Sequence, residues 1–493
     1  MGHKIGYNHT KITSIKMINS KLTKSACLSL PFLLGGCVDQ SPTVLQQIKA
    51  KGELVVATRY SPTTYYIGPS GETGFEYDLA RRFADYLGVD LKIVTGANAS
   101  EVMDLVKRGE ANLAAAGIPV SDGPARQVRY GPAYQTITPQ LIYRRGDTPP
   151  GNLQGLQQVK LDMAAGSIPL EILRRLRQQL PGLSWTAHSG VASGELLAKV
   201  WKGEYQFTVA NSNEVAFLQQ FYPELRVAFD LTAPKPLAWV FPRRKDSSLY
   251  YKAYDFFHKI KNNGVLNQIT ERYYGHLRDF DYVGTRRFMR HVDSRLPRFM
   301  NVFREAAQHT GFDWRLLAAI GYQESHWNPH AVSPTGVRGL MMLTQDTAQQ
   351  VQIDNRNDPK QSILGGARYF KMVKDSLPDH ILEPDRTWLA LAAYNVGIGH
   401  LEDARVITQA RGGDPDAWMD VKESLPLLRK KKWYRHTKYG YARGDEAVDY
   451  VENIRVYYDL LVWAMDFQKS SPTATLTAAR TTTTDTAPAI PAL

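Results

Sequence analysis

Glu324 is the residue of this sequence best placed for acid–base chemistry. Asp313 can cap a helix in which Leu317, Ile320 and Glu324 follow at spacings i, i+3 and i+7, so the glutamate falls on the face expected to be buried. Asn328-Pro329 ends that helix soon afterwards, which places the carboxyl near the negative end of the helix dipole. Both surroundings favour the protonated form that a general acid requires, although most helical glutamates are simply solvated.

Three segments around this glutamate narrow the chemistry. They cover residues 324–329, 333–341 and 393–397, and they resemble the lytic transglycosylases related to g-type lysozymes. A fourth segment, 446–451, resembles the late helix of that family whose tyrosine faces the same cleft. The resemblance implies an all-α, lysozyme-like domain that cleaves the glycan strands of peptidoglycan, with Glu324 as the catalytic acid and then the base.

The same resemblance implies a groove that binds sugars. A hydroxyl, an amide or a phenol can hydrogen-bond N-acetyl and hydroxyl groups, and a thioether can pack against a sugar face. Met341 and Tyr450 could equally be ordinary core residues. Met342 departs from the pattern, because many relatives carry Gln at that place. The residues expected to line the groove are Ser333, Met341, Tyr394, Asn395 and Tyr450.

A single carboxyl in the first three segments favours an internal nucleophile over hydrolysis. Ordinary glycosidases use two carboxyls that flank the scissile bond. The family resemblance implies that the muramic 6-hydroxyl attacks instead, which leaves 1,6-anhydromuramic ends and needs no water, metal or cofactor. A hydrolytic lysozyme remains the alternative, because Asp354 or Asp358 could fold into the cleft.

The first half of the chain alternates short apolar strands with amphipathic helices. Residues 54–57 and 91–94 are strand-like, and the helical spacing of Phe75, Leu79, Phe83 and Leu87 predicts a helix that Gly88 ends. This alternation continues to Gly275 and is typical of a βαβ-type sheet domain.

Segments 74–79, 121–134 and 263–275 resemble the bacterial extracellular solute-binding proteins for amino acids, over most of residues 54–275. The resemblance implies a two-lobed, type II periplasmic-binding-protein-like fold. Ser121 and Arg126 would hold a ligand carboxylate, which a guanidinium can grip with two hydrogen bonds. Asn211 stands where the family usually has an Asp for the ligand ammonium, which makes a free amino acid a doubtful ligand. The expected ligand of this domain is a muropeptide or an amino acid.

The chain from Arg286 to Phe467 is helical in pattern, and the Thr-, Ala- and Pro-rich end cannot build a core. A chain of 493 residues is too long for a single hydrophobic core, so we expect two folded domains with flanking segments, five parts in all. These are a signal peptide at 1–36, whose true start could be Met17, a tether at 37–48, an α/β domain at 49–277, an all-α domain at 278–468 and a disordered tail at 469–493.

The N-terminus predicts export and a lipid anchor. Five Lys precede an apolar run at residues 26–34 that is too short to span a bilayer. The run ends in Leu34-Gly35-Gly36-Cys37, which resembles the lipobox of bacterial lipoproteins and makes Cys37 the acylated residue. Cys27 would leave with the signal, so no internal disulfide is expected. Val38 is not the Asp that usually retains lipoproteins in the inner membrane, so the resemblance points to the periplasmic face of the outer membrane.

The net charge of +12 becomes +7 once the five lysines leave with the signal, and this moderately basic surface suits an acidic partner such as peptidoglycan, anionic lipid headgroups or nucleic acid. Export argues against nucleic acid. A second class of function remains open, in which the front domain is an envelope sensor for muropeptides and the helical domain only tethers it to the glycan. No metal site is expected.

Overall fold

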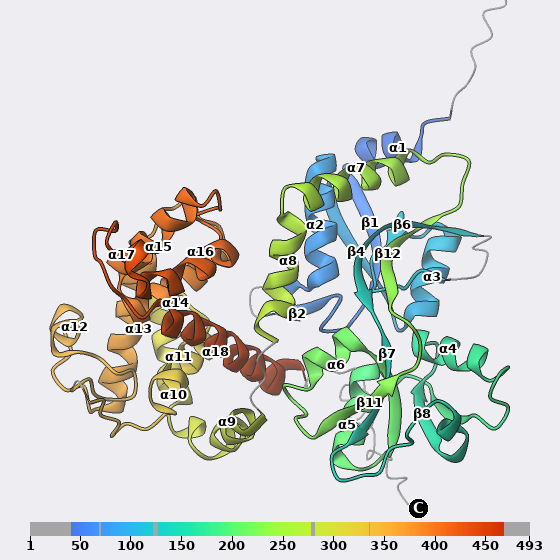
Figure 1. Ribbon diagram of the computed structural model, residues 1–493. Helices are drawn as coiled ribbons and strands as arrows, with labels where there is room; N and C mark the ends of the chain where they lie inside the picture. The colour runs from blue at the N-terminus through green and yellow to red at the C-terminus, as the bar shows by residue number, and fades with distance from the viewer. Residues whose placement is uncertain (1–40, 69–70, 122–126, 278–281, 335, 468–493) are drawn as a thin grey trace, which may run out of the picture. The chain divides into compact units, whose positions relative to one another are not determined.

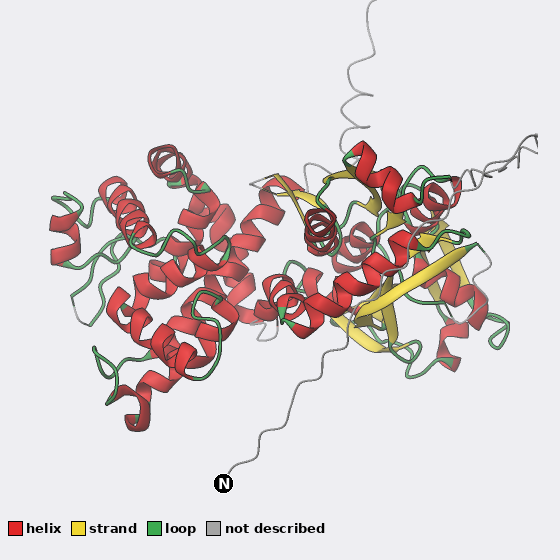
Figure 2. Ribbon diagram, turned by 90° about the horizontal axis from the view of Figure 1, so that it is seen from above, coloured by secondary structure: helices red, strands yellow, loops and turns green. Residues whose placement is uncertain are grey.

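The computed structural model describes residues 41–68, 71–121, 127–277, 282–334 and 336–467 (Figure 1). The expected signal peptide, Cys37 and the tail at 469–493 lie outside these residues. Strands occur only up to β12, and the later described residues form helices and loops (Figure 2). The predicted order, an α/β domain followed by an all-α domain, is confirmed. No helix among the described residues is both long and apolar enough to cross a bilayer.

The first lobe of the α/β domain is built on a five-stranded sheet of order β4-β1-β5-β12-β6. Strand β1 runs parallel to β4 and β5, and β12 runs antiparallel to β5 and β6. The strands are β1 Glu53–Arg59, β4 Asp90–Gly96, β5 Leu113–Ala114, β6 Val128–Ile137 and β12 Lys235–Pro242, with the hairpin β2 Tyr66–Gly68 and β3 Gly71–Thr73 beside them.

The helices of the first lobe pack on this sheet in two clusters, one around Leu79, Phe83, Trp239 and Phe257 and a second that contains Val102 and Val106. They are α1 Val44–Lys51, α2 Phe75–Leu87, α3 Ala99–Arg108, α7 Ser248–Asn262, α8 Val265–Tyr274 and the 3₁₀ turn η2 Gly275–Leu277. The predicted helix 75–87 and the strands at 54–57 and 91–94 are therefore confirmed. The expected tether differs from the structure from Val44 on, because Thr43 caps α1 with a capping box and Ile48 is buried.

The second lobe holds a three-stranded antiparallel sheet of order β10-β7-β11 and a parallel pair, β8 and β9. The chain enters this lobe after β6 and leaves it before β12. Its elements are β7 Pro139–Arg144, η1 Gln154–Gln158, β8 Lys160–Ala164, α4 Ile168–Leu176, β9 Ser184–His188, α5 Ser193–Lys202, β10 Phe207–Asn211, α6 Ser212–Leu218 and β11 Leu225–Asp230.

The helical domain surrounds one almost wholly buried helix, α11 Trp314–Ser325, which packs against α10, α13 and α18. The other elements are α9 Tyr282–Ser294, η3 Leu296–Arg298, α10 Met300–Thr310, α12 Gln345–Gln350, α13 Pro359–Asp375, α14 Asp385–Val396, α15 Ile398–Ala410, α16 Trp418–Ser424, η4 Leu425–Arg429, α17 Lys431–Tyr434, α18 Gly444–Val462 and the π turn η5 Trp463–Phe467.

Candidate active site

Helix α11 carries Glu324 in its last turn. Asp313 caps the helix as predicted, because its side chain accepts a hydrogen bond from the backbone N–H of Arg315 at 2.9 Å. The buried stretch runs through Tyr322, and the turn that follows reaches the surface. The helix ends at Ser325, earlier than the expected stop at Asn328-Pro329, because His326 adopts a left-handed conformation with φ 52°. The glutamate therefore lies in the last turn, at the negative end of the helix dipole.

Among the residues that the structure describes, the carboxyl of Glu324 has one hydrogen-bond donor. The phenol of Tyr450 on α18 donates to its Oε1 at 2.6 Å. Burial raises the pKa of Glu324 from its ordinary 4.5 to about 7, against the smaller lowering that the hydrogen bond from Tyr450 causes. A carboxyl in this state exchanges its proton near neutral pH.

Two tyrosines form one wall beside the carboxyl. The rings of Tyr394, from α14, and Tyr450 stack with centroids 6.4 Å apart and planes 17° apart. The hydroxyl of Tyr394 donates to the backbone oxygen of Met341 at 3.2 Å. Burial first, and then the negative charge of Glu324, raise the pKa of each phenol well above 10, so both remain donors.

Hydrogen bonds from side chains to backbone carbonyls hold the loop after α11 against the helix. Ser325 donates to the carbonyl of Leu340 at 2.8 Å, and the indole of Trp327 donates to Ala318 at 2.8 Å. Gly339 has φ 87°, and a Cβ there would lie 1.9 Å from the carbonyl oxygen of Arg356. Only glycine fits that position, so the loop keeps its path past Glu324.

The structure brings together Glu324, Tyr394, Tyr450 and the backbone of Met341. The Met341 side chain, Ser333 and Asn395 lie in three different environments. The Met341 side chain is fully buried and packs against Gly366, which agrees with the core alternative. The hydroxyl of Ser333 accepts from the backbone of Val337 at 3.0 Å within its own loop. Asn395 is exposed in the last turn of α14.

The residues expected to bind a ligand in the α/β domain are only partly described. The Arg175 guanidinium donates to the Ser121 hydroxyl at 3.2 Å, while Arg126 lies outside the described residues. Asn211 is buried at the end of β10, and its Oδ1 has no hydrogen-bond partner within the described ranges. Sequence reasoning missed an ion pair nearby, between Arg59 and Glu214, whose N–O distance is 2.6 Å.

Sequence reasoning also missed a buried carboxyl with several donors, Glu76 in the first turn of α2. Its Oε1 accepts from the backbone N–H of Gly117 at 2.8 Å and from the phenol of Tyr134, and its Oε2 accepts from the indole of Trp239 at 3.0 Å. The signal available was its place between Phe75 and Leu79 in an amphipathic helix, but its donors are far away in sequence. Over the described ranges, no group of three His, Cys, Asp or Glu is arranged to hold a metal ion.

Comparisons with known proteins agree with this division of the chain. The family model "Bacterial extracellular solute-binding proteins, family 3" matches residues 53–276, and the model "Transglycosylase SLT domain" matches residues 301–416. The membrane-bound lytic murein transglycosylase F of Saccharophagus degradans is 45% identical over 92% of this chain and 91% of its own length.

The chain belongs to the membrane-bound lytic murein transglycosylase F family. A second member, the transglycosylase F 1 of Alkalilimnicola ehrlichii, is 48% identical over 85% of each chain. The protein is therefore a lytic murein transglycosylase with a solute-binding-like domain, as the sequence resemblances predicted. Among solved structures, the cysteine-binding protein of Campylobacter jejuni matches 49% of this chain and 97% of its own, with 15% identity and a TM-score of 0.44.

Proposed function

We propose that Glu324 is the single acid–base group with which this transglycosylase F member cleaves peptidoglycan. The bond is the β-1,4 linkage between N-acetylmuramic acid and N-acetylglucosamine, and the product carries a 1,6-anhydromuramic end. The observation that carries the proposal is the carboxyl itself, whose pKa is raised to about 7 by burial beside a single phenol donor. A group with that pKa can give and take a proton in the same reaction.

The reaction then runs in two proton transfers. Protonated Glu324 gives its proton to the glycosidic oxygen as the C1–O bond breaks, and the N-acetyl group of the substrate stabilises the cationic carbon. The Glu324 carboxylate next takes the proton of the muramic 6-hydroxyl, whose oxygen bonds to C1. The hydrogen bond from Tyr450 strengthens as Glu324 becomes charged, so it stabilises the intermediate carboxylate between the two transfers.

Two further observations support a mechanism with one carboxyl. Asp358, which could have been the second acid, caps α13 by accepting from the backbone of Gln361 at 2.8 Å. The pKa of Glu324 responds to burial and to Tyr450, with no contribution from another carboxylate of the described residues. A hydrolase of the two-carboxyl type would place its partner about 5–9.5 Å away.

The test is the chemical nature of the new chain ends. Purified protein is incubated with peptidoglycan, and mass spectrometry separates anhydromuramic ends from reducing ends. We expect anhydro ends from wild type, none from Glu324→Gln, and wild-type activity from Glu423→Gln, whose glutamate is exposed on α16. Reducing ends alone would identify a hydrolase. Undiminished cleavage by Glu324→Gln would remove Glu324 from the reaction, and an absence of cleavage by wild type would favour the sensor alternative.

We propose further that the α/β domain binds a muropeptide or an amino acid through Ser121, Arg126 and Asn211. The buried, unbonded Oδ1 of Asn211 supports this, because such an atom gains a partner when a polar ligand binds. Calorimetry with a muropeptide tests the proposal, and an Arg126→Ala variant should lose the heat of binding. Equal binding by that variant would reject this site.

We also propose that Cys37 carries a lipid that holds the protein on the periplasmic face of the outer membrane. The lipobox-like residues before Cys37, Val38 after it and the name of the related enzymes, "membrane-bound", support the proposal. Fractionation should find wild type with outer-membrane markers and Cys37→Ala in the soluble fraction. Retention of the variant in the membrane would contradict a lipid anchor at this cysteine.

A further inference from the structure

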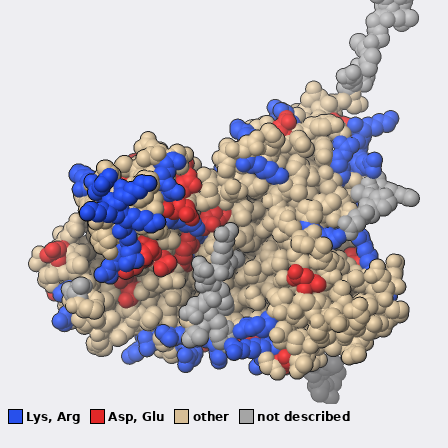
Figure 3. Space-filling model, in the orientation of Figure 1, with Lys and Arg blue, Asp and Glu red and all other residues tan. Residues whose placement is uncertain are grey.

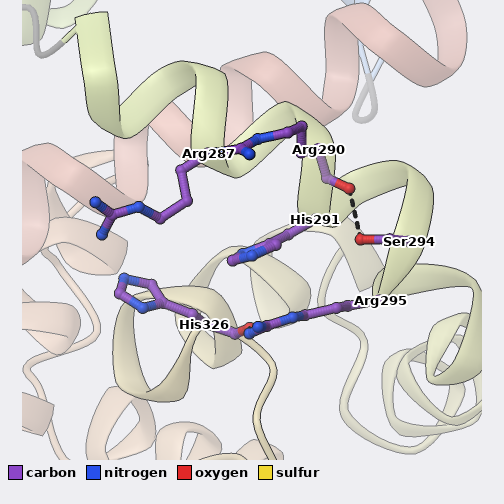
Figure 4. A pocket seen from close by; sticks show the side chains of 6 residues that line it. All are labelled: Arg287, Arg290, His291, Ser294, Arg295 and His326. Atoms are coloured by element: carbon purple, nitrogen blue, oxygen red, sulfur yellow. Dashed lines mark hydrogen bonds between the residues drawn. The ribbon is translucent and has the colours of Figure 1, made fainter.

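The helical domain contains a hollow of about 560 Å³ that is separate from the carboxyl of Glu324 (Figure 4). One wall is α9, and the other is the end of α11. In Figure 4 the Arg287 side chain extends toward His326, and His291 and Arg295 lie beneath it. The lining residues are Arg287, Arg290, His291, Ser294, Arg295 and His326.

The lining of this basic pocket is cationic. It holds three guanidinium groups and two imidazoles but no carboxylate, and none of the three arginines has an ion-pair partner among the residues that the structure describes. Desolvation first, and then the neighbouring arginines, lower the pKa of His291 and of His326. The imidazoles are therefore neutral donors near pH 7, and the arginines supply the charge. Arg287 and Arg290 are exposed to solvent and free to meet an anion.

The basic pocket also contacts the helix that carries Glu324. The Nη1 of Arg295 donates to the backbone carbonyl of His326 at 2.8 Å, directly after the last turn of α11. His291 Nδ1 lies 3.2 Å from the hydroxyl of Tyr322, a buried residue of the same helix. An anion bound here would thus lie close to the end of α11, two residues beyond the proposed acid.

We infer that the basic pocket binds carboxylate groups of the peptide stems that the muramic residues of peptidoglycan carry. A guanidinium recognises a carboxylate with two parallel hydrogen bonds, and two exposed arginines one turn apart on α9 can grip one extended peptide. Lipid phosphate has similar chemistry. Many membrane-docking surfaces add exposed apolar side chains that insert beside their cations, and none of the large exposed apolar side chains of the described residues lines this pocket, which favours the peptide stems over lipid.

This inference rests on the proposed function for the identity of the polymer, so its first test compares two forms of the substrate. Glycan strands with intact stems and the same strands stripped by an amidase are cleaved by wild type and by an Arg287→Gln/Arg290→Gln variant. We expect the variant to raise KM about 3- to 10-fold on strands with stems, with kcat unchanged, and to behave like wild type on stripped strands.

The matched control is Arg298→Gln, an exposed arginine in η3 outside the basic pocket, which should match wild type on both substrates. An equal rise in KM on both forms of the strand would show a general effect of charge and overturn the assignment to stems. Identical kinetics of wild type and the double variant would overturn it as well.

A second measurement needs no cleavage, so it separates failure of the basic pocket from failure of the proposed function. In a Glu324→Gln background, NMR follows the ring resonances of His291 and His326 during titration with the free stem tetrapeptide. We expect both resonances to shift, and the shifts to vanish in the added Arg287→Gln/Arg290→Gln variant. The absence of shifts, or shifts produced only by phosphatidylglycerol vesicles, would overturn the inference. If the tetrapeptide shifts the resonances but wild type gives no anhydro products, the proposed function is rejected and the basic pocket is retained.

Discussion

Glu76 is a buried carboxyl and Glu324 a half-buried one, and they differ in the number of donors around them. Three groups donate to Glu76, from Gly117, Tyr134 and Trp239, whereas among the described residues only Tyr450 donates to Glu324. Glu76 begins its helix, where the dipole favours a negative charge, and Glu324 ends its helix, where the dipole opposes it. Burial raises the pKa of both.

The difference separates a structural carboxyl from a reactive one. The oxygens of Glu76 are occupied by donors from other segments of the first lobe, so the residue holds together β6, β12 and the end of β5. Glu324 has spare acceptor capacity and reaches the surface in the last turn of α11. A buried carboxyl is available for proton transfer only where its surroundings leave it under-bonded.

The largest expected effect is on the rate of glycan cleavage. Glu324→Gln should lower the rate about 10³-fold, because the amide can neither give nor take the proton. Glu76→Gln should leave the rate per folded molecule unchanged. Anhydro products counted by mass spectrometry measure both variants side by side. A loss of similar size in Glu76→Gln would end the distinction between the two carboxyls.

Glu324→Gln should lower the rate of cleavage but raise the stability of the helical domain. A folded-state pKa of about 7 against an ordinary 4.5 means that ionised Glu324 costs about 3 kcal/mol at pH 8. That cost shrinks below about 1 kcal/mol at pH 5, where the folded form keeps its proton. The variant should therefore unfold at a higher temperature than wild type at pH 8, with a smaller gain at pH 5. Calorimetry at both pH values checks this, and a gain independent of pH would contradict it.

Glu76→Gln should instead destabilise the α/β domain. An amide can keep one oxygen for Gly117 and Tyr134, but its NH₂ group then faces the indole N–H of Trp239. We expect a loss of about 1–3 kcal/mol, the usual cost of a buried donor without an acceptor. Denaturant unfolding followed by the fluorescence of Trp239 measures it. Glu72→Gln, at a more exposed position near the same helix, is the control and should lose less.

The smallest expected effect is on the pH dependence of cleavage, after removal of the Tyr450 hydroxyl that donates to Glu324. Because the hydrogen bond from Tyr450 lowers the pKa of Glu324, Tyr450→Phe should raise that pKa above its wild-type value. In wild type, cleavage should fall as the pH rises through about 7, since the acid loses its proton. That descending limb should move to higher pH in the variant. A pH profile of kcat tests this, and an unmoved limb would show that Tyr450 does not act on the carboxyl.

Local patterns in the sequence were enough to predict the helix 75–87, the strands at 54–57 and 91–94, and the capped helix that carries Glu324. These elements depend on neighbours within a few turns, on side-chain period and on terminating residues. The exact end of α11 was missed, because the left-handed conformation of His326 is fixed by the loop that follows it.

The environment of each carboxyl could be predicted only in part. Tyr450 was expected near Glu324 through the family resemblance, although 126 positions separate them. The full burial of Met341 follows from the close approach of Gly366, which no periodicity reveals. The three donors to Glu76 and the pair of Arg59 with Glu214 come from distant segments, and contacts of that kind depend on the assembled fold.

Strand β12 places a constraint on the order in which the chain can fold. It lies between β5 and β6, so these two strands do not pair with each other. Their shared neighbour forms only after residues 235–242 have been synthesised. A chain that has been synthesised only as far as the second lobe therefore presents open strand edges, which favour aggregation. The helical domain also depends on a late segment, because α11 packs mainly against α18 and Glu324 meets Tyr450 126 positions later. Each domain is therefore completed by an element from the end of its own stretch of sequence.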